Sequence, residues 1–436
     1  MDYKVEELRK NIDVTRSWEK LEYTGWQDEN LSWKNDCYIG DWSQMVEYRV
    51  TGPDALKFFS DFAVNNFEKF AIRQAKHIIF CNNDGKVIGD GILIRFAEDD
   101  FEFQSGGLVW SWIEYNCRKG KYDVSTSKND NKFKYQVSGP KSLYLMEKVT
   151  GKNLRDIKFM HLGRAQINDV NVDLLRQGMA GEIGFEIQGP REKGEEIYNT
   201  VFEKGLEYSI KRIGSRTAMV NHMEACFPTV VHDYLPAVTE ESEEDYWNTY
   251  NIKDHTGQGF LERFLKVKGS FEADNISAWY RSPIELGWES RINFNHDFYG
   301  CKALKKEASN PKRKIVTLIW NLEDVLDVYT SLFNDDIPYD FMDFPRQQWY
   351  CNFADKVIYG DKVIGISTNR CFSYYFRKMI SHCSIDLDYS KLGTEVNIVW
   401  GDPGSRQKTI RATVAQSPFK SDNRRVDLSS LPDKIL

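Results

Sequence analysis

Residues 178–190 read GMAGEIGFEIQGP, a glycine-punctuated turn and strand with two glutamates four residues apart. If FEIQ is a strand, Phe185 and Ile187 face one side of the sheet and Glu186 faces the other, because strand side chains alternate. The Glu186 carboxylate could then accept two parallel hydrogen bonds from a planar heterocycle with adjacent N–H donors. An exposed strand glutamate is the alternative interpretation. Glu182 falls in the turn, where we expect it to be solvated.

The composition favours a globular protein with a small-molecule partner. The 436 residues, 41% of them hydrophobic and 14% aromatic, predict two or three domains with substantial cores. The formal net charge of -7 and the lack of a long basic block argue against nucleic acid. The N-terminal MDYKVEELRKN is charged where a signal peptide would be apolar, and no segment is long enough to span a bilayer. We expect a cytoplasmic protein that does not bind a membrane.

The residue types that commonly bind metals show no clustering. Eight cysteines and seven histidines are dispersed along the chain, without a CxxC pair or an HExxH motif. The phosphate-binding patterns GxGxxG and GxxxxGK[ST] are also absent. The sequence therefore predicts reduced thiols and no metal site, and it excludes the simplest nicotinamide, flavin and nucleotide sites.

The hydrophobic pattern predicts helices alternating with strands first and mostly strands later. The first part contains predicted helices, a long strand and hairpins, at 27–36 (helix), 38–50 (strand), 52–64 (helix), 77–96 (hairpin with an Asn-Asp-Gly turn), 101–106 (strand), 108–117 (helix), 121–139 (hairpin), 140–149 (helix) and 191–213 (helix). The acidic stretch at about 237–270 is typical of a surface insertion, and short strands after residue 310 predict a β-barrel or sandwich. The fold class is therefore α+β, with two ferredoxin-like layers and a C-terminal β domain.

Long and idiosyncratic strings in this sequence resemble one protein superfamily. MAGEIGFEI is similar to the YTGEDGFEI hairpin of the T-protein of the glycine cleavage system. Four other strings resemble the same superfamily in the same order along the chain: VTGPDALKFF, NNDGKVIGDGIL, ELGWESRINFNHDFYGCKAL and TIRATVAQSPF. Within it, GWQDENLSWKNDC, AKHIIFCNNDGKVIGDGIL, GSFEADNISAWYRSPIELGW and RKIVTLIWNLEDV resemble the tetrahydrofolate-dependent aromatic O-demethylases that act on vanillate and syringate. The resemblance covers nearly the whole chain.

This resemblance implies a three-domain cloverleaf around a central tunnel that holds tetrahydrofolate. A discontinuous first α+β domain would comprise residues 1–48 and 138–236, and a second α+β domain residues 49–137. An insertion and connecting segment would follow at 237–309, and a C-terminal β-barrel or jelly-roll domain at 310–436.

The resemblance also implies functional residues. Glu186 matches the pterin-binding glutamate, Asp90 the aspartate beside the transferred one-carbon unit, and Arg216 an arginine near the substrate or folate end. A backbone-paired strand residue and a helix-terminal ion pair are the structural alternatives for Asp90 and Arg216. His232 and Tyr234, in FPTVVHDYLPA, are candidates for serving the leaving group, with a loop histidine and a packing tyrosine as alternatives.

The sequence departs from the demethylases around the expected substrate. DWSQM stands where vanillate demethylases carry QSHHM, and SGGLVWSW stands where they carry a glycine followed by an arginine. Trp42, Gln44 and Trp110 would then face a donor that is less anionic, bulkier or more apolar than vanillate, unless the tryptophans fill the core. Met179 replaces the tyrosine of YTGED and would alter contact with the pterin.

Three functions follow, from different classes. The first is transfer of a methyl group from a methoxyaromatic, or from another small methyl donor, to N5 of tetrahydrofolate, giving 5-methyltetrahydrofolate without an obligatory protein partner. The second is an aminomethyltransferase that works with a lipoyl carrier protein. The third is a non-catalytic folate-binding maintenance protein, whose KGCYxGQE motif contrasts with FYGCKALKKE around Cys301 in this chain.

Overall fold

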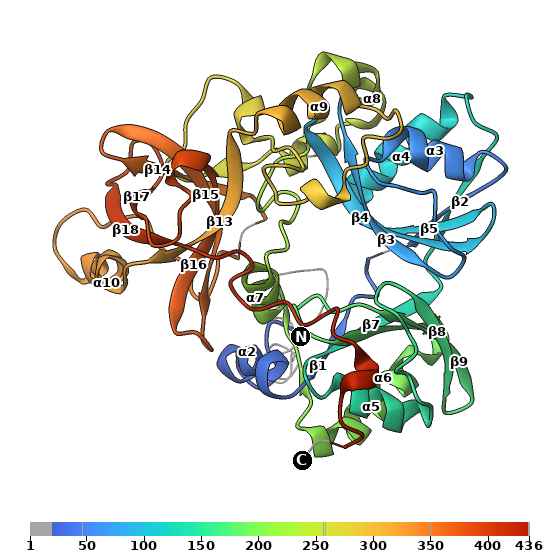
Figure 1. The fold of residues 1–436 in the computed structure, drawn as a ribbon. Helices are drawn as coiled ribbons and strands as arrows, with labels where there is room; N and C mark the ends of the chain where they lie inside the picture. Colours follow the sequence, from blue (N-terminus) through green and yellow to red (C-terminus); the bar gives the residue numbers. More distant parts are fainter. Residues whose placement is uncertain (1–19, 46, 256, 258, 349, 435–436) are drawn as a thin grey trace. The chain divides into compact units, whose positions relative to one another are not determined.

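The computed structural model describes residues 20–45, 47–255, 257, 259–348 and 350–434, which fall into two compact units (Figure 1). The described part of the first unit is 20–44, 131–222 and 422–434. The second unit comprises the described residues of 45–130 and 223–421. Helix α7 (Ser215–Ala225) crosses the boundary between them.

The first unit is built on a six-stranded sheet. Its strand order is β11 (Lys211–Arg212), β1 (Tyr38–Asp41), β7 (Lys132–Ser138), β10 (Gly184–Pro190), β9 (Val170–Arg176) and β8 (Leu162–Ile167). All neighbours are antiparallel except β11 and β1. Helices α5 (Ser142–Thr150) and α6 (Gly194–Gly205) share one core with Phe185 and Ile187 of β10, and α2 (Trp26–Asn35) precedes β1. The alternation predicted for FEIQ therefore turns Glu186 away from the helices.

The second unit begins with a five-stranded antiparallel sheet. Its order is β3 (Ala75–Cys81), β4 (Val87–Ala97), β5 (Asp100–Gln104), β2 (Glu47–Thr51) and β6 (Ser125–Asn129). Helices α3 (Ala55–Phe62), α4 (Gly107–Arg118) and α8 (Glu244–Tyr250) contribute to its aromatic core. The predicted Asn-Asp-Gly turn is confirmed, with Gly85 at φ 72°, a left-handed conformation that glycine adopts readily.

A β-barrel completes the second unit. Its strands are β13 (Arg313–Trp320), β14 (Asn352–Tyr359), β15 (Lys362–Ser373), β16 (Lys378–Asp386), β17 (Glu395–Trp400) and β18 (Lys408–Ala415). Pairing of β14 with β17 closes these six strands into a ring, and β12 (Val267–Lys268) adds to β14 from outside. Helix α9 (Cys301–Ser309) precedes the barrel and α10 (Leu322–Thr330) lies within its sequence. Two α+β layers and a C-terminal β domain confirm the predicted fold class, whereas the cloverleaf and the central tunnel stay predictions.

Short 3-10 helices connect these elements. They are η1 (Arg191–Lys193), η2 (Leu206–Tyr208), η3 (Glu241–Glu243), η4 (Leu261–Phe264), η5 (Ile276–Trp279), η6 (Glu289–Arg291), η7 (Ser331–Phe333), η8 (Leu387–Tyr389) and η9 (Leu428–Ser430).

Two predictions for strands were wrong, one in the number of strands and one in their pairing. The single strand predicted at 38–50 is two strands in different sheets, because the Asp41 carboxylate accepts a hydrogen bond from the Ser43 amide (2.8 Å) and forms a turn. The hairpin predicted at 121–139 does not form. Strand β6 pairs with β2, whereas β7 pairs with β1 and β10, so the two runs belong to different sheets.

Two further predictions differ in extent. The helix predicted at 191–213 ends at Gly205, and Ser209 takes a left-handed conformation (φ 59°) before β11. The acidic segment is not a surface insertion throughout. Tyr246 is fully buried, and Glu243 accepts a hydrogen bond from the Trp112 indole (2.7 Å), while burial raises the pKa of this glutamate.

The structure also places two segments differently from the predicted domain ranges. Strand β7 lies in the sheet of the first unit, although most of it falls within the predicted 49–137 domain. Residues 422–434 belong to the first unit and not to the C-terminal β domain. Both segments contribute apolar residues to the core of the first unit, which a linear division of the sequence does not reveal. The other predicted boundaries stay predictions.

Candidate functional site

Glu186 lies in the middle of a buried polar face of the first unit's sheet. Its side chain is 1% exposed, and its two oxygens accept hydrogen bonds from Gln177 Nε2 (2.9 Å) and Gln188 Nε2 (2.6 Å). Across the strands it stands opposite Gln136 of β7. Buried carboxylates are costly without hydrogen-bond donors, and these two amides supply donors that also fix the orientation of the carboxylate.

Two acceptors on this face have no donor within the described part of the chain. They are Gln136 Oε1 and Gln188 Oε1, both buried. A buried carbonyl without a partner is uncommon because its desolvation is not repaid. Together with the Glu186 carboxylate, these oxygens are suited to a flat ligand that presents several N–H groups.

Glu182 contradicts the expectation of a solvated turn residue. It is 5% exposed, and its carboxylate accepts a hydrogen bond from Asn423 Nδ2 (2.7 Å). The Asn423 amide also donates to the Gly181 carbonyl (2.9 Å). The C-terminal segment therefore covers the turn, a contact between residues about 240 positions apart that no local pattern predicts.

The other predicted residues of the first unit have structural contacts. Arg216 forms an ion pair with Glu22 (2.5 Å), with both side chains more than a quarter exposed, as the structural alternative expected. Met179 is half-buried in the turn before β10. Trp42 is 4% exposed, and Gln44 Nε2 is buried without a hydrogen-bond partner among the residues described. Their assignment to folate or substrate stays a prediction.

In the second unit, Trp110 of α4 packs in the aromatic core. Its ring stacks on Tyr48, with centroids 4.3 Å apart and planes 11° apart, and it is 8% exposed. This is the contact expected of a core tryptophan. Its assignment as a substrate residue stays a prediction.

Asp90 and Tyr234, both predicted from sequence, meet in the second unit. The Tyr234 hydroxyl donates to Asp90 Oδ1 (2.7 Å), and His77 Nε2 lies 2.8 Å from Asp90 Oδ2. The rings of His77 and Tyr234 both contact Trp288 edge-on, at 5.1 and 6.1 Å between centroids. We refer to Asp90, His77 and Tyr234 as the Asp90 cluster.

The members of the Asp90 cluster differ in exposure. Tyr234 is fully buried, whereas the side chains of His77 and Asp90 are 17% and 22% exposed. Burial, and then the neighbouring Asp90 carboxylate, raise the pKa of Tyr234 well above its ordinary value. Tyr234 therefore remains a neutral phenol that donates a hydrogen bond to Asp90.

The chain segment that carries Tyr234 is attached to the barrel by Asp233. The Asp233 carboxylate accepts hydrogen bonds from His382 Nδ1 (2.8 Å), Thr368 Oγ1 (3.1 Å), Asn369 Nδ2 (3.0 Å) and the Thr229 amide (2.8 Å). Both members of the Asp233–His382 pair have side chains only 1% exposed. The neighbouring backbone of Tyr234 is thereby fixed to β15 and β16.

His232 does not join the Asp90 cluster. Asp90 accepts side-chain hydrogen bonds from Tyr234 and His77 and none from His232. The His232 ring instead meets Tyr350 edge-on at 5.4 Å, and its carbonyl accepts a hydrogen bond from Asn352 (3.2 Å). A catalytic role for His232 stays a prediction.

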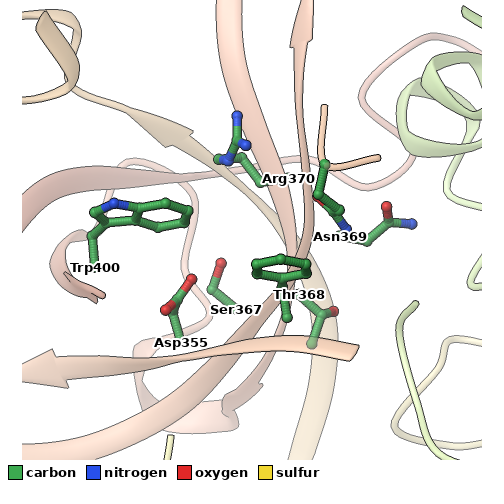
Figure 2. A pocket seen from close by; sticks show the side chains of 8 residues that line it. Asp355, Ser367, Thr368, Asn369, Arg370 and Trp400 are labelled. Carbon is green, nitrogen blue, oxygen red and sulfur yellow. The ribbon is translucent and has the colours of Figure 1, made fainter. Parts of the chain in front are cut away.

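A narrow polar pocket lies beside this attachment, lined by residues of β14, β15 and β17 (Figure 2). The Arg370 guanidinium lies over the Trp400 ring, 5.4 Å from its centroid, and Asp355 stands below them in the view. Burial raises the pKa of Asp355 to about 7. Thr368 and Asn369 line the pocket and also bond Asp233, so these side chains support the Asp233 attachment.

The described ranges hold no group of three or more His, Cys, Asp or Glu side chains arranged to bind a metal ion. None of the helices in those ranges combines the length and the apolar character needed to cross a bilayer.

The sequence matches the family model for the GCVT N-terminal domain over residues 7–242, which is more than half of the chain. The chain belongs to this family. It is 32% identical to the sesamin methylene transferase of a Sinomonas species over 435 residues, covering 95% of this chain and 94% of that protein. It is 29% identical to the syringate O-demethylase of a Sphingobium species, with 92% and 89% coverage.

Similarity extends to aminomethyltransferases at lower identity. The aminomethyltransferase of Alkaliphilus oremlandii is 24% identical, with 92% of this chain and 91% of that protein covered. The crystal structure of aminomethyltransferase T from Bartonella henselae superposes with a TM-score of 0.66 at 17% identity, covering 93% and 92% of the two chains. The predicted resemblance to T-proteins and to syringate-type demethylases is thereby confirmed.

Membership of the GCVT family identifies tetrahydrofolate as the co-substrate and one-carbon transfer as the class of reaction. The buried face around Glu186 fits that molecule, because a pterin ring presents N–H donors to acceptors such as Gln136 Oε1 and Gln188 Oε1. Glu186 was a candidate from the sequence and its role stays a prediction, whereas Gln136, Gln177 and Gln188 of the same face were not candidates. Strand alternation in the sequence could have placed Gln188 on the same face as Glu186. Placing Gln136 and Gln177 on that face required knowledge of which strands pair.

Proposed function

We propose that this protein transfers the methyl group of a methoxyaromatic donor to N5 of tetrahydrofolate, releasing a phenol and 5-methyltetrahydrofolate. The single observation that carries the proposal is the match to a syringate O-demethylase across nearly the full length of both chains. A small-molecule donor, the cytosol as the place of action and independence from a carrier protein belong to the same proposal.

The first unit would hold the pterin. Glu186 accepts from the 2-amino group and its neighbouring ring N–H, and the free oxygens of Gln136 and Gln188 accept from further N–H groups. The charge-assisted pair supplies most of the affinity, because hydrogen bonds to a carboxylate are worth about 1.5–3 kcal/mol. Met179 and Arg216 would border the same ligand.

Asp90 would assist the transfer. N5 is an amine whose lone pair attacks the methyl carbon in line with the breaking C–O bond, and positioning the two reactants lowers the barrier by several kcal/mol. Positive charge develops on N5, and the Asp90 carboxylate stabilises it. The Tyr234 hydroxyl donates a hydrogen bond to Oδ1 of Asp90 and thereby fixes the orientation of the carboxylate. The family resemblance assigns Trp42, Gln44, Trp110 and His232 to the donor.

Incubation of the protein with tetrahydrofolate and a panel of methoxyarenes tests the proposal. The panel includes vanillate, syringate and methoxyphenols without a carboxylate, and mass spectrometry of the folate products is the readout. We expect 5-methyltetrahydrofolate from at least one donor, with carboxylate-free donors preferred. Absence of a modified folate with every donor would overturn the proposal, and activity that requires a lipoyl carrier protein would favour an aminomethyltransferase instead.

A specific observation favours a second candidate, transfer of a methylene group. The relative at 32% identity is named a sesamin methylene transferase. Adding a methylenedioxyarene to the donor panel separates the two reactions, because the transferred carbon then reaches folate at a different oxidation level. A methylene-bearing folate formed only with this donor would replace the methyl-transfer proposal.

A further inference from the structure

We propose that His77 is the general acid that protonates the oxygen leaving the one-carbon donor, with Asp90 orienting its ring. This inference rests on the proposed function, which requires that a poor leaving group, a phenoxide, receive a proton. Tyr234, the sequence-predicted candidate that contacts Asp90, does not supply that proton. Its hydroxyl is buried and donates a hydrogen bond to Asp90.

The strand register brings His77 to Asp90. Strands β3 and β4 are antiparallel, with Ile79 opposite Asp90 and His77 opposite Ile92. His77 is two residues from Ile79 and therefore points to the same face of the sheet as Asp90, as a diagonal neighbour. The 2.8 Å contact between His77 Nε2 and Asp90 Oδ2 follows from this placement.

The contacts of the ring leave one nitrogen available. Nε2 faces the carboxylate, and the edge-on contact with Trp288 restricts rotation of the ring. Within the described ranges, His77 Nδ1 has no hydrogen-bond partner, and the side chain is 17% exposed. An imidazolium donates from both nitrogens, so a His77 cation bonded to Asp90 offers its second proton, on Nδ1, to a ligand.

The proposed step balances without an additional reactant. The N5 lone pair forms the new N–C bond while the C–O bond breaks and its electron pair passes to oxygen. His77 Nδ1 gives its proton to that oxygen, and a phenol leaves. The methylated N5 then loses its own proton, which restores the imidazolium directly or through solvent, so the protein ends unchanged.

The leaving group provides the decisive test. A general acid matters most when the leaving oxygen is strongly basic, and its contribution is typically about 10²–10⁴-fold in rate. We expect His77→Asn to lower the turnover of methoxyphenol donors by about 10²-fold or more. A nitro-substituted methoxyarene gives a phenoxide that leaves without protonation. With this donor, His77→Asn should lower the turnover by only about tenfold or less. Added imidazole should restore part of the methoxyphenol activity of His77→Ala.

Two measurements separate this role from a structural one. Folate affinity, followed by fluorescence titration, should be the same in His77→Asn and the wild type, and so should the melting temperature. His161→Gln is the matched control, because His161 is a half-buried histidine of the first unit whose Nδ1 lies 3.0 Å from the Phe159 carbonyl. It should leave the dependence on the leaving group unchanged.

The outcomes distinguish the two proposals. A wild-type protein that modifies folate, combined with equal losses for both donors in His77→Asn or no loss at all, overturns the role of His77 and leaves the proposed function standing. A wild-type protein that modifies no folate with either donor overturns the proposed function and the role of His77 with it.

Discussion

Two aspartate–histidine pairs in the second unit have the same contact distance and different surroundings. In both pairs a ring nitrogen lies 2.8 Å from a carboxylate oxygen. The side chains of His77 and Asp90 are 17% and 22% exposed, whereas those of His382 and Asp233 are each 1% exposed. The same chemical pair therefore stands at an accessible position in one place and inside the structure in the other.

The hydrogen bonds complete the contrast. His382 Nδ1 faces Asp233 and His382 Nε2 lies 3.2 Å from the Met223 carbonyl, so both nitrogens face acceptors and the ring fits as an imidazolium with two donors. Burial alone would raise the pKa of Asp233, but the His382 charge and the hydrogen bonds from His382, Thr229 and Asn369 outweigh it and lower that pKa. A saturated pair of this kind fixes chain segments, whereas the unused nitrogen of the other pair is the one to which we assign proton transfer.

The largest effect is expected from breaking the buried pair. Asp233→Ala leaves the His382 charge buried without its partner, which typically costs about 3–5 kcal/mol. We expect urea denaturation to show that loss in the free energy of unfolding. Asp388→Ala, at an exposed aspartate of η8, should change it by less than about 0.5 kcal/mol. Equal stability of the two variants would contradict the structural role of the Asp233–His382 pair.

The accessible pair should instead affect catalysis. Asp90→Asn keeps the shape of the side chain and removes the charge that stabilises developing positive charge on N5. We expect kcat/KM to fall by about 10²–10³-fold, equivalent to about 2.7–4 kcal/mol, with little change in unfolding free energy. If Asp90→Asn unfolds as readily as Asp233→Ala while the remaining folded protein turns over normally, the distinction between the two pairs is wrong.

A third carboxylate, the buried Glu186, extends the comparison to a site whose hydrogen-bond donors are amides. Glu186→Gln should weaken tetrahydrofolate binding by about 1.5–3 kcal/mol, because the charged acceptor is lost. Glu182→Gln is the matched control, since Glu182 is buried in the same hairpin and bonded to Asn423. Fluorescence titration should show near wild-type folate affinity for this control. Similar losses in both variants would indicate damage to the hairpin and not loss of a pterin contact.

The smallest effect concerns the acid limb of the stability curve. Because the pKa of Asp233 in the folded protein lies below its ordinary value of 3.8, its contribution to stability is present above that value and is lost as the pH falls through the folded pKa. Asp233 adds at most about 1.4 kcal/mol per pH unit to the slope of the unfolding free energy against pH. As the pH falls below 3.8 toward the lower pKa of the folded state, Asp233→Asn should lose stability less steeply than the wild type in urea titrations. Parallel curves would contradict the assignment.

Several features could be predicted from the residues because their causes are local. Alternation in FEIQ predicted that Glu186 lies on the opposite face of the strand from Phe185 and Ile187. The Asn-Asp-Gly turn predicted the β3–β4 hairpin. His77 was within reach of the same reasoning, since the turn connects the two strands. Its partner could not be assigned, however, because the register shifts between Phe80 and Cys81, and a shift of one residue exchanges the faces of a strand.

The sequence by itself determined the fold class and the family, and it singled out Glu186 and Asp90 as candidate functional carboxylates, because periodicity and contiguous motifs are properties of neighbouring residues. Only the tertiary structure decided that β6 and β7 separate into different sheets, that Asn423 buries Glu182, and that His382 closes on Asp233. These outcomes depend on pairing between residues far apart in the chain, where burial and hydrogen-bond satisfaction choose among partners that local patterns leave equivalent.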